Sequence, residues 1–139
     1  MNRAATLQGF LPLEQIERPQ LTYYEQGQQF TPHFDWYADK QGRVIDREAT
    51  LFAYINQSCT ECGTAFPSRT IDWSQKDSRW CQFFDCHNES LVAKALARGA
   101  IYWRNVDQDG NGLPESLHAG LPVEDGFKAG LNLWTTILK

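Results

Sequence analysis

Short strand-like runs alternate with clusters of turn-forming residues along the chain, and this spacing limits the folds it can adopt. Six runs that alternate in polarity or are rich in β-branched and aromatic residues predict strands at 21–24, 29–34, 50–55, 64–66, 100–104 and 131–138. Gly, Pro, Asn, Asp and Ser fill the segments between them, including a predicted turn at 67–68. Helical spacing of apolar residues occurs only at 11–18 and 89–97. The pattern predicts an all-β sandwich or barrel with minor helix.

With 139 residues, the chain is expected to form a single domain over 1–139. Its net charge is -4 and its basic residues are scattered, so neither nucleic acid nor a membrane is expected as a partner. No apolar stretch approaches the length of a membrane span, and 1–11 lacks the pattern of a signal peptide, which predicts a cytoplasmic location. Four cysteines and the sequons at Asn56 and Asn88 favour the secretory pathway instead, so both locations stay open.

One pair of side chains suggests a metal site. His33 and Asp35 are separated by one residue in a predicted strand, so their side chains lie on the same face. A third ligand from far along the chain would complete a site of two histidines and one carboxylate, which suits non-haem Fe(II) and leaves positions for substrate and dioxygen. His118 is the candidate, because its neighbours are small or turn-forming, whereas His87 lies beside Cys86 in a loop-like segment. The same pair also fits an ordinary solvated strand end.

Lys128 is a second unusual residue. It follows the predicted turn at 124–126 in a strand-like stretch, where its side chain would face the interior. A buried lysine needs a counter-charge or a ligand, whereas a lysine that extends to the rim is merely solvated. Its position in the sequence does not decide between the two.

Together these residues and their neighbours resemble a known family, the prolyl 4-hydroxylases that use Fe(II) and 2-oxoglutarate. The motifs that carry the resemblance are Tyr24-x2-Gly27, His33-x-Asp35, Gly63-Thr64-x-Phe66-Pro67, Gly99-Ala100-x2-Trp103, Ser116-Leu117-His118-Ala119-Gly120-x-Pro122-Val123 and Gly126-x-Lys128, followed by Trp134. Their order and spacing fit the family over about 21–135. Asn132-x-Trp134 and Trp80-Cys81-x4-Cys86 are similar to its fungal branch.

The resemblance implies a fold and a metal site. The fold would be a double-stranded β-helix, the jelly-roll or cupin-like core, over 21–135, with 1–20 as an atypical N-terminal segment. His33, Asp35 and His118 would hold Fe(II), with no further catalytic acid or base.

It also implies a co-substrate site. Lys128 would pair with the distal carboxylate of 2-oxoglutarate, and such a charge-assisted bond is strong in a dry pocket. Tyr24 and Thr64 would offer hydroxyl groups, and Trp134 would form a wall of the pocket or part of the core. Thr64 is the weaker assignment, because Glu61-Cys62-Gly63 stands where the family more often has paired glycines.

The activity implied by the family is hydroxylation of an unactivated C–H bond. Dioxygen and 2-oxoglutarate would be consumed, succinate and carbon dioxide released, and ascorbate would be an accessory reductant. The default substrate is a prolyl residue in a peptide, with a free amino acid or a secondary-metabolite intermediate as small-molecule alternatives. Substrate choice is expected in the loops 37–48 and 67–78, where Arg47 and Arg69 would meet an acidic group or simply be solvated.

The chain departs from the family pattern at its start. The resemblance implies that about fifty residues that normally precede the Tyr24 strand either have no counterpart in this protein or are missing from a truncated sequence. Exposed apolar surface is therefore expected, with a homodimer or poor solubility as the result. The alternative function is a catalytically incomplete homologue that binds a metal or a partner.

Two other motifs offer rival binding sites. Cys59-x2-Cys62 and Cys81-x4-Cys86 fit a zinc site, disulfides or free thiols, and the spacing leaves these open. Asp107-x-Asp109-x-Asn111-Gly112 matches the first half of a calcium-binding loop, but His118 stands where the loop needs glutamate. A simple turn is the favoured interpretation of this segment.

Overall fold

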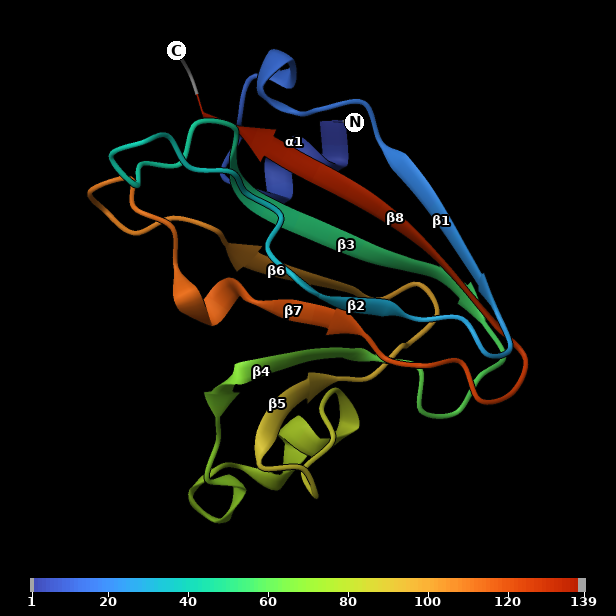
Figure 1. Ribbon diagram of the computed structural model, residues 1–139. Coiled ribbons are helices and arrows are strands. Elements are labelled where there is room, and N and C mark those ends of the chain that lie inside the picture. The colour runs from blue at the N-terminus through green and yellow to red at the C-terminus, as the bar shows by residue number, and fades with distance from the viewer. Residues whose placement is uncertain (1, 138–139) are drawn as a thin grey trace.

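Two four-stranded antiparallel sheets face each other in the computed structural model, which describes residues 2–137 (Figure 1). One sheet has the strand order β1-β8-β3-β6 and the other β2-β7-β4-β5. This order is a jelly roll, so the predicted all-β, double-stranded β-helix class is confirmed. The strands are β1 (Gln20–Glu25), β2 (Phe30–His33), β3 (Arg47–Gln57), β4 (Thr64–Thr70), β5 (Ser90–Ala93), β6 (Ala100–Arg104), β7 (His118–Gly120) and β8 (Phe127–Thr136).

Helical structure is limited to short segments. The α-helix α1 covers Asn2–Leu7, and 3₁₀ turns cover Leu13–Gln15, Trp73–Gln75, Ser78–Gln82 and Pro114–Ser116. None of the helices in the described part of the chain has the length and apolar character of a membrane span.

Strands are present at all six predicted places, although residue 138, the last of the strand predicted at 131–138, lies outside the described residues. The helix predicted at 89–97 is wrong. Its first half is β5, in which Leu91 pairs with Phe66 and Ala93 pairs with Thr64 across β4. Val92 and Ala93 are buried. This short apolar run makes its backbone hydrogen bonds at the edge of the sheet and not within a helix. The predicted helix at 11–18 is reduced to the 3₁₀ turn Leu13–Gln15.

The turn predicted at 67–68 is also wrong, since both residues lie inside β4. The ladder between β4 and β5 is irregular from Phe66 to Thr70. Pro67, which has no N–H, fits such an irregularity in a strand. The first residues of the predicted substrate loop 67–78 are therefore part of the sheet.

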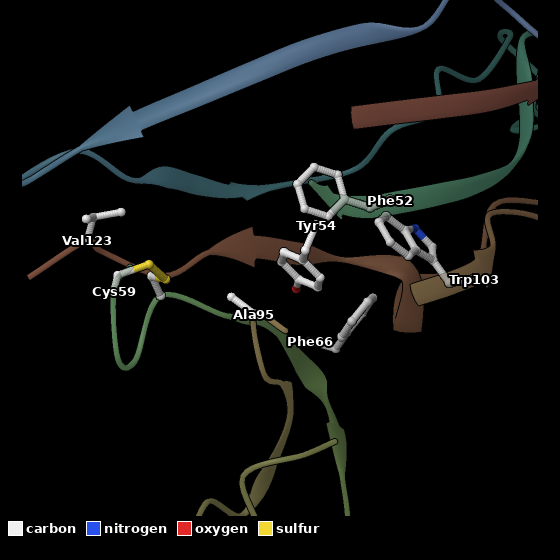
Figure 2. Packing of buried hydrophobic residues seen from close by; sticks show 8 residues of the cluster. Phe52, Tyr54, Cys59, Phe66, Ala95, Trp103 and Val123 are labelled. Atoms are coloured by element: carbon white, nitrogen blue, oxygen red, sulfur yellow. A yellow bond between two sulfur atoms is a disulfide. The ribbon is translucent and has the colours of Figure 1, made fainter. Parts of the chain in front are cut away.

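Alternation along β3 and β8 separates an inner face from an outer face. Thr50 pairs with Trp134 and Phe52 with Asn132, and these residues point toward the opposite sheet. A Cβ atom at Gly130 would overlap the Phe52 ring, so only glycine leaves room for that ring. Figure 2 shows Phe52 near Tyr54, Phe66 and Trp103 in the core between the sheets.

The outer face of the first sheet is apolar and only partly covered. Ala4 and Ala5 of α1 and the nearby Ile16 pack against Leu51 and Leu133 at one end of this face. Further along, Leu21, Tyr23 and Tyr102 are exposed. The core that positions the cavity lies between the sheets, not on this outer face.

Candidate metal and co-substrate site

The register between β2 and β7 brings two distant histidines together. His33 ends β2, His118 begins β7, and the two are direct partners in the antiparallel ladder. Their ring centroids lie 4.3 Å apart. Asp35 follows His33 by two residues and turns its carboxylate toward both rings. The structure thus assembles the three residues that the sequence predicted as metal ligands.

The distances within this triad suit one shared metal ion. Nε2 of His33 lies 3.6 Å from Oδ1 of Asp35, and Nε2 of His118 lies 3.5 Å from Oδ2. One ligand atom from each residue can be chosen so that all three lie within 4.8 Å of one another. A single ion placed among these atoms would contact all three and keep an open side.

The backbone fixes which ring nitrogen faces the metal position. Nδ1 of His33 lies 2.8 Å from the carbonyl oxygen of Thr31, and Nδ1 of His118 lies 2.9 Å from that of Ser116. Each Nδ1 therefore carries the proton and donates it, which leaves the lone pair on Nε2 for a metal. Carbonyl anchoring of this kind is typical of metal-binding histidines.

Asp35 is held as a carboxylate. Burial by itself would raise the pKa of Asp35, but the contact with His33, the nearby His118 and the Thr50 hydroxyl outweigh it and lower the pKa. Thr50 donates to Oδ2 over 2.8 Å, and Asn105 donates to Thr50 over 3.2 Å. Asp35 is thus an anionic, oriented oxygen ligand.

Burial keeps His118 neutral. It lowers the pKa of His118, although the charge of Asp35 acts in the opposite direction. A neutral imidazole is the form that binds metal. Two imidazoles and one carboxylate fit a divalent first-row metal, and Fe(II) is the ion for which this open triad is typical.

All seven predicted site residues line one cavity of about 310 Å³. They are Tyr24, His33, Asp35, Thr64, His118, Lys128 and Trp134. The volume is at the lower end of the range for small-molecule sites. A small metabolite beside a metal ion would fit it.

Lys128 is buried in this cavity, with 2% of its surface exposed. Nζ donates to the carbonyl oxygen of Cys62 over 2.7 Å and lies 3.5 Å from that of Leu121. Among the residues the structure describes, no carboxylate forms an ion pair with it. Burial lowers its pKa to about 8, so the side chain is a cation at neutral pH.

The Lys128 ammonium is close to the triad along β7. A Cβ atom at Gly120 would lie 3.4 Å from Nζ, and Gly120 is two residues from His118 in the same strand. Two residues of a strand span about 7 Å. A five-carbon dicarboxylate could bridge such a separation.

Tyr24 and Thr64 lie near the lysine. Tyr24 pairs with Lys128 between β1 and β8, and its ring centroid lies 4.9 Å from Nζ. Thr64 begins β4, and its hydroxyl is 2.7 Å from the hydroxyl of Tyr54. Both predicted hydroxyls border the cavity, although that of Thr64 already has a protein partner.

Trp134 forms a wall of the cavity together with Arg47. The Arg47 guanidinium lies 3.6 Å from the centroid of the Trp134 ring, pairs with Glu17 over 2.9 Å and donates to the backbone oxygen of Asp35. Both arginines were predicted in loops, but Arg47 begins β3 and Arg69 lies in β4, so that placement is wrong. Arg69 does not border this cavity and donates to the Glu115 carbonyl instead.

Three supporting residues were not predicted from the sequence. Thr50 and Asn105 orient Asp35, and Tyr54 holds Thr64. The period-2 alternation of β3 would have placed Thr50 and Tyr54 on the same face as Phe52. No comparable signal existed for Asn105, because it follows β6 in an irregular segment.

The remaining motifs do not form rival sites. The cysteines form the disulfides Cys59–Cys62 and Cys81–Cys86, and no thiol is left for zinc. The Asp107 carboxylate accepts hydrogen bonds from the backbone of Asp109 and Asn111, which closes a turn. The turn interpretation of this segment therefore stands.

The fold and site define a jelly roll with two histidines, one carboxylate and a buried lysine around one cavity. No family model matches the sequence. The chain is 32% identical over 128 residues to the probable prolyl 4-hydroxylase 6 of Arabidopsis thaliana and 33% identical over 132 residues to its prolyl 4-hydroxylase 2. Both matches cover 90% of this chain and 43% of the relative, so the chain spans less than half the length of these curated relatives.

Solved structures agree on the fold. A crystal structure of the viral collagen prolyl hydroxylase from Paramecium bursaria Chlorella virus-1 matches 89% of this chain and 57% of that one, with a TM-score of 0.67 and 25% identity. Its complex with 2-oxoglutarate gives a TM-score of 0.65 at 24% identity, covering 89% of this chain and 60% of the other. A Pseudomonas putida prolyl-4-hydroxylase gives 0.57 at 15% identity over 98% of this chain and 61% of the other. These comparisons support the prolyl 4-hydroxylase-like family; they do not test the resemblance to its fungal branch.

Proposed function

We propose that this chain is a 2-oxoglutarate-dependent dioxygenase domain that uses Fe(II) and dioxygen to hydroxylate an unactivated C–H bond. The observation that carries the proposal is that one small cavity holds both a metal triad and a buried lysine that forms no ion pair with any residue in the described range 2–137. A ligand that chelates the metal with one end and offers a carboxylate at the other satisfies both. The similarity to prolyl 4-hydroxylases supports 2-oxoglutarate as that ligand.

Each cavity residue then has a defined task. His33, Asp35 and His118 would hold Fe(II), which with dioxygen and 2-oxoglutarate supplies the oxidative chemistry. Lys128 would bind the distal carboxylate, and the Tyr24 hydroxyl would donate to the same group. These contacts fix the orientation of the co-substrate before the reaction and exclude water from the site.

We propose a prolyl residue in a peptide as the substrate, because the relatives are prolyl hydroxylases by name. A free amino acid or a secondary-metabolite intermediate is the alternative, since the residues of the loop 37–48 do not by themselves identify a substrate. Ascorbate would act as an accessory reductant. The rival function, a catalytically incomplete homologue, is less favoured because every predicted metal ligand is present and oriented.

Anaerobic titration with Fe(II) and 2-oxoglutarate tests this proposal without knowledge of the substrate. The expected result is a weak visible charge-transfer band as the keto acid chelates iron. The band should vanish in His33→Ala and weaken in Lys128→Ala. His87→Ala is the matched control, because His87 is exposed and outside the cavity.

A folded protein that binds Fe(II) but gives no band with 2-oxoglutarate would contradict the proposal. The same holds if the band persists unchanged in His33→Ala. Either result would favour the homologue that binds metal without turnover.

A further inference from the structure

The position of the Lys128 ammonium depends on a short disulfide loop. Its nearest partner is the carbonyl oxygen of Cys62, 2.7 Å away, and Cys62 is bonded to Cys59. The second carbonyl, that of Leu121, belongs to a segment that donates to Gly63 beside the same loop over 2.9 Å. Both acceptors of the lysine are thus tied to residues 59–63.

The loop is also attached to the strand that carries the lysine. The backbone N–H and the hydroxyl of Thr60 both donate to the Asp125 carboxylate, over 3.2 and 3.1 Å. Ser58 donates its N–H to the Phe127 carbonyl, and the Phe127 N–H donates back to the Ser58 hydroxyl. The disulfide loop therefore contacts both the turn that precedes Lys128 and the lysine itself.

The disulfide is part of the core. Cys59 and Cys62 are 4% and 1% exposed, and they pack in the same cluster as Tyr54 and Val123. Figure 2 shows the sulfur pair beside Val123 at one end of this cluster. A cross-link between residues this close in sequence constrains the unfolded chain little. Its main effect is expected to be local, on the direction of the Cys62 carbonyl.

We propose that the Cys59–Cys62 disulfide is a positioning element for co-substrate binding, because it holds the Cys62 carbonyl that fixes the Lys128 ammonium. Without the cross-link, the carbonyl is free to rotate away, and the ammonium loses its fixed direction toward the cavity. The inference rests on the proposed function, in which Lys128 binds the distal carboxylate of 2-oxoglutarate. The inference gives a role in co-substrate binding to two residues, Cys59 and Cys62, that do not line the cavity.

The test compares two keto acids in anaerobic titrations of the Fe(II)-loaded protein. 2-Oxoglutarate has a distal carboxylate, and 2-oxovalerate has the same chain length without it. In Cys59→Ala/Cys62→Ala, we expect the Kd of 2-oxoglutarate to rise about tenfold, the size of one charged hydrogen bond. The Kd of 2-oxovalerate and the affinity for Fe(II) should stay unchanged, which a general loss of structure would not produce.

Cys81→Ala/Cys86→Ala is the matched control. In this second disulfide the carbonyl of Cys81 also accepts a hydrogen bond from a lysine, Lys94, over 2.7 Å. Neither the two cysteines nor this lysine lines the cavity. This variant should leave both Kd values unchanged. An equal loss of 2-oxoglutarate affinity in the two double variants would overturn the inference.

A milder variant covers the case in which Cys59→Ala/Cys62→Ala does not fold. Asp125→Ala removes an exposed anchor of the loop and keeps both cysteines. It should raise the Kd of 2-oxoglutarate about threefold, the loss of part of one hydrogen bond, with 2-oxovalerate unaffected. No change in this variant would overturn the inference where the double variant does not fold.

Lys128→Ala separates failure of this inference from failure of the proposed function. If Lys128→Ala weakens 2-oxoglutarate binding and the disulfide variant does not, the positioning role is wrong and the proposed function stands. If wild-type protein does not prefer 2-oxoglutarate to 2-oxovalerate, the proposed function itself is wrong.

Discussion

Lys128 carries a charge that the surrounding protein does not neutralise. Its ammonium has two carbonyl partners and is 2% exposed. Burial lowers its pKa to about 8 from the ordinary lysine value of 10.5, so folding disfavours the protonated form. A group in this state is more often part of a ligand site than of a structural core.

The pKa of Lys128 predicts how 2-oxoglutarate binding depends on pH. Binding of an anion requires the protonated lysine, which the free protein loses as the pH rises through about 8. The Kd of 2-oxoglutarate should be constant below that pH and rise about tenfold per unit above it. Anaerobic titration at several pH values measures this. Lys128→Met should bind weakly and without this dependence; an identical pH profile in the variant would refute the assignment.

The same pKa predicts a stability effect. Between about 8 and 10.5 the unfolded chain binds the proton and the folded protein does not, so wild-type stability should rise with pH in this window. At pH 7 the buried charge opposes folding in full. Lys128→Met should therefore stabilise the ligand-free protein by about 1–2 kcal/mol at that pH. This gain is smaller than the pKa shift of Lys128 implies, because the substitution also leaves the Cys62 carbonyl without its hydrogen-bond donor. Urea denaturation with and without the substitution checks the sign.

Removal of the Thr50 hydroxyl is expected to change the affinity for the metal. Its hydroxyl donates to Oδ2 of Asp35, so Thr50→Val leaves that oxygen without its partner and the carboxylate less fixed. The affinity for Fe(II) should fall about tenfold, as for other residues that orient metal ligands. Thr135→Val is the control, because Thr135 is equally buried but bonds to Gln8 outside the cavity. Equal metal affinity in Thr50→Val and wild type would show that the hydroxyl does not matter.

At the scale of elements, strand register decides which residues meet. His33 and His118 become neighbours through the β2–β7 ladder, and Tyr24 and Lys128 through the β1–β8 ladder. A shift of one residue in either ladder would turn these side chains to the opposite face. The site therefore depends on packing interactions that hold the register.

Gly130 is one such position in β8. A Cβ atom there would overlap the Phe52 ring, which lies in the core and borders the cavity. Gly130→Ala should destabilise the fold by about 1–3 kcal/mol, as other overpacked cores are destabilised. Thermal denaturation measures the effect, with the neighbouring Ala129→Ser, on the opposite face of β8, as the control. A stability equal to wild type would mean that Phe52 moves without cost.

The sequence predicted most elements because they are short runs rich in apolar, β-branched and aromatic residues, as in 50–55 and 100–104, bounded by turn-forming residues. It failed at β5, where Leu91, Val92 and Ala93 suit a strand and a helix equally. Only the partner strand β4, distant in sequence, removed that ambiguity. β7 has three residues, too few for any periodicity to be visible.

At the scale of the whole molecule, the outer face of the first sheet carries a group of exposed apolar side chains. Leu21 and Tyr23 of β1 and Tyr102 of β6 share this face with Ala129 and Leu131 of β8, by the register of the ladders. Leu21 is 67% exposed and Tyr23 57% exposed. Apolar patches of this kind commonly mark contact surfaces.

We propose that two copies of this chain associate through this face. Size-exclusion chromatography with light scattering should give a concentration-dependent dimer for wild type and a monomer for Leu21→Lys/Tyr23→Lys. Phe83→Lys, an exposed aromatic residue outside this face, should remain dimeric. Wild-type protein that stays monomeric over the whole concentration range would refute the dimer.

The sequence by itself predicted the all-β fold class, because short strand-like runs and turn-forming residues alternate along it. Its resemblance to the prolyl 4-hydroxylases, and not periodicity, pointed to the three metal ligands and to Lys128 as the co-substrate lysine. The sequence could not determine how Lys128 is held, how Asp35 is oriented or how the cysteines pair. These features depend on contacts between residues such as Cys62 and Lys128, or Asp35 and Asn105, that are far apart in the chain. Only the register of the two sheets brings such residues within hydrogen-bonding distance, and register is a property of the packed molecule.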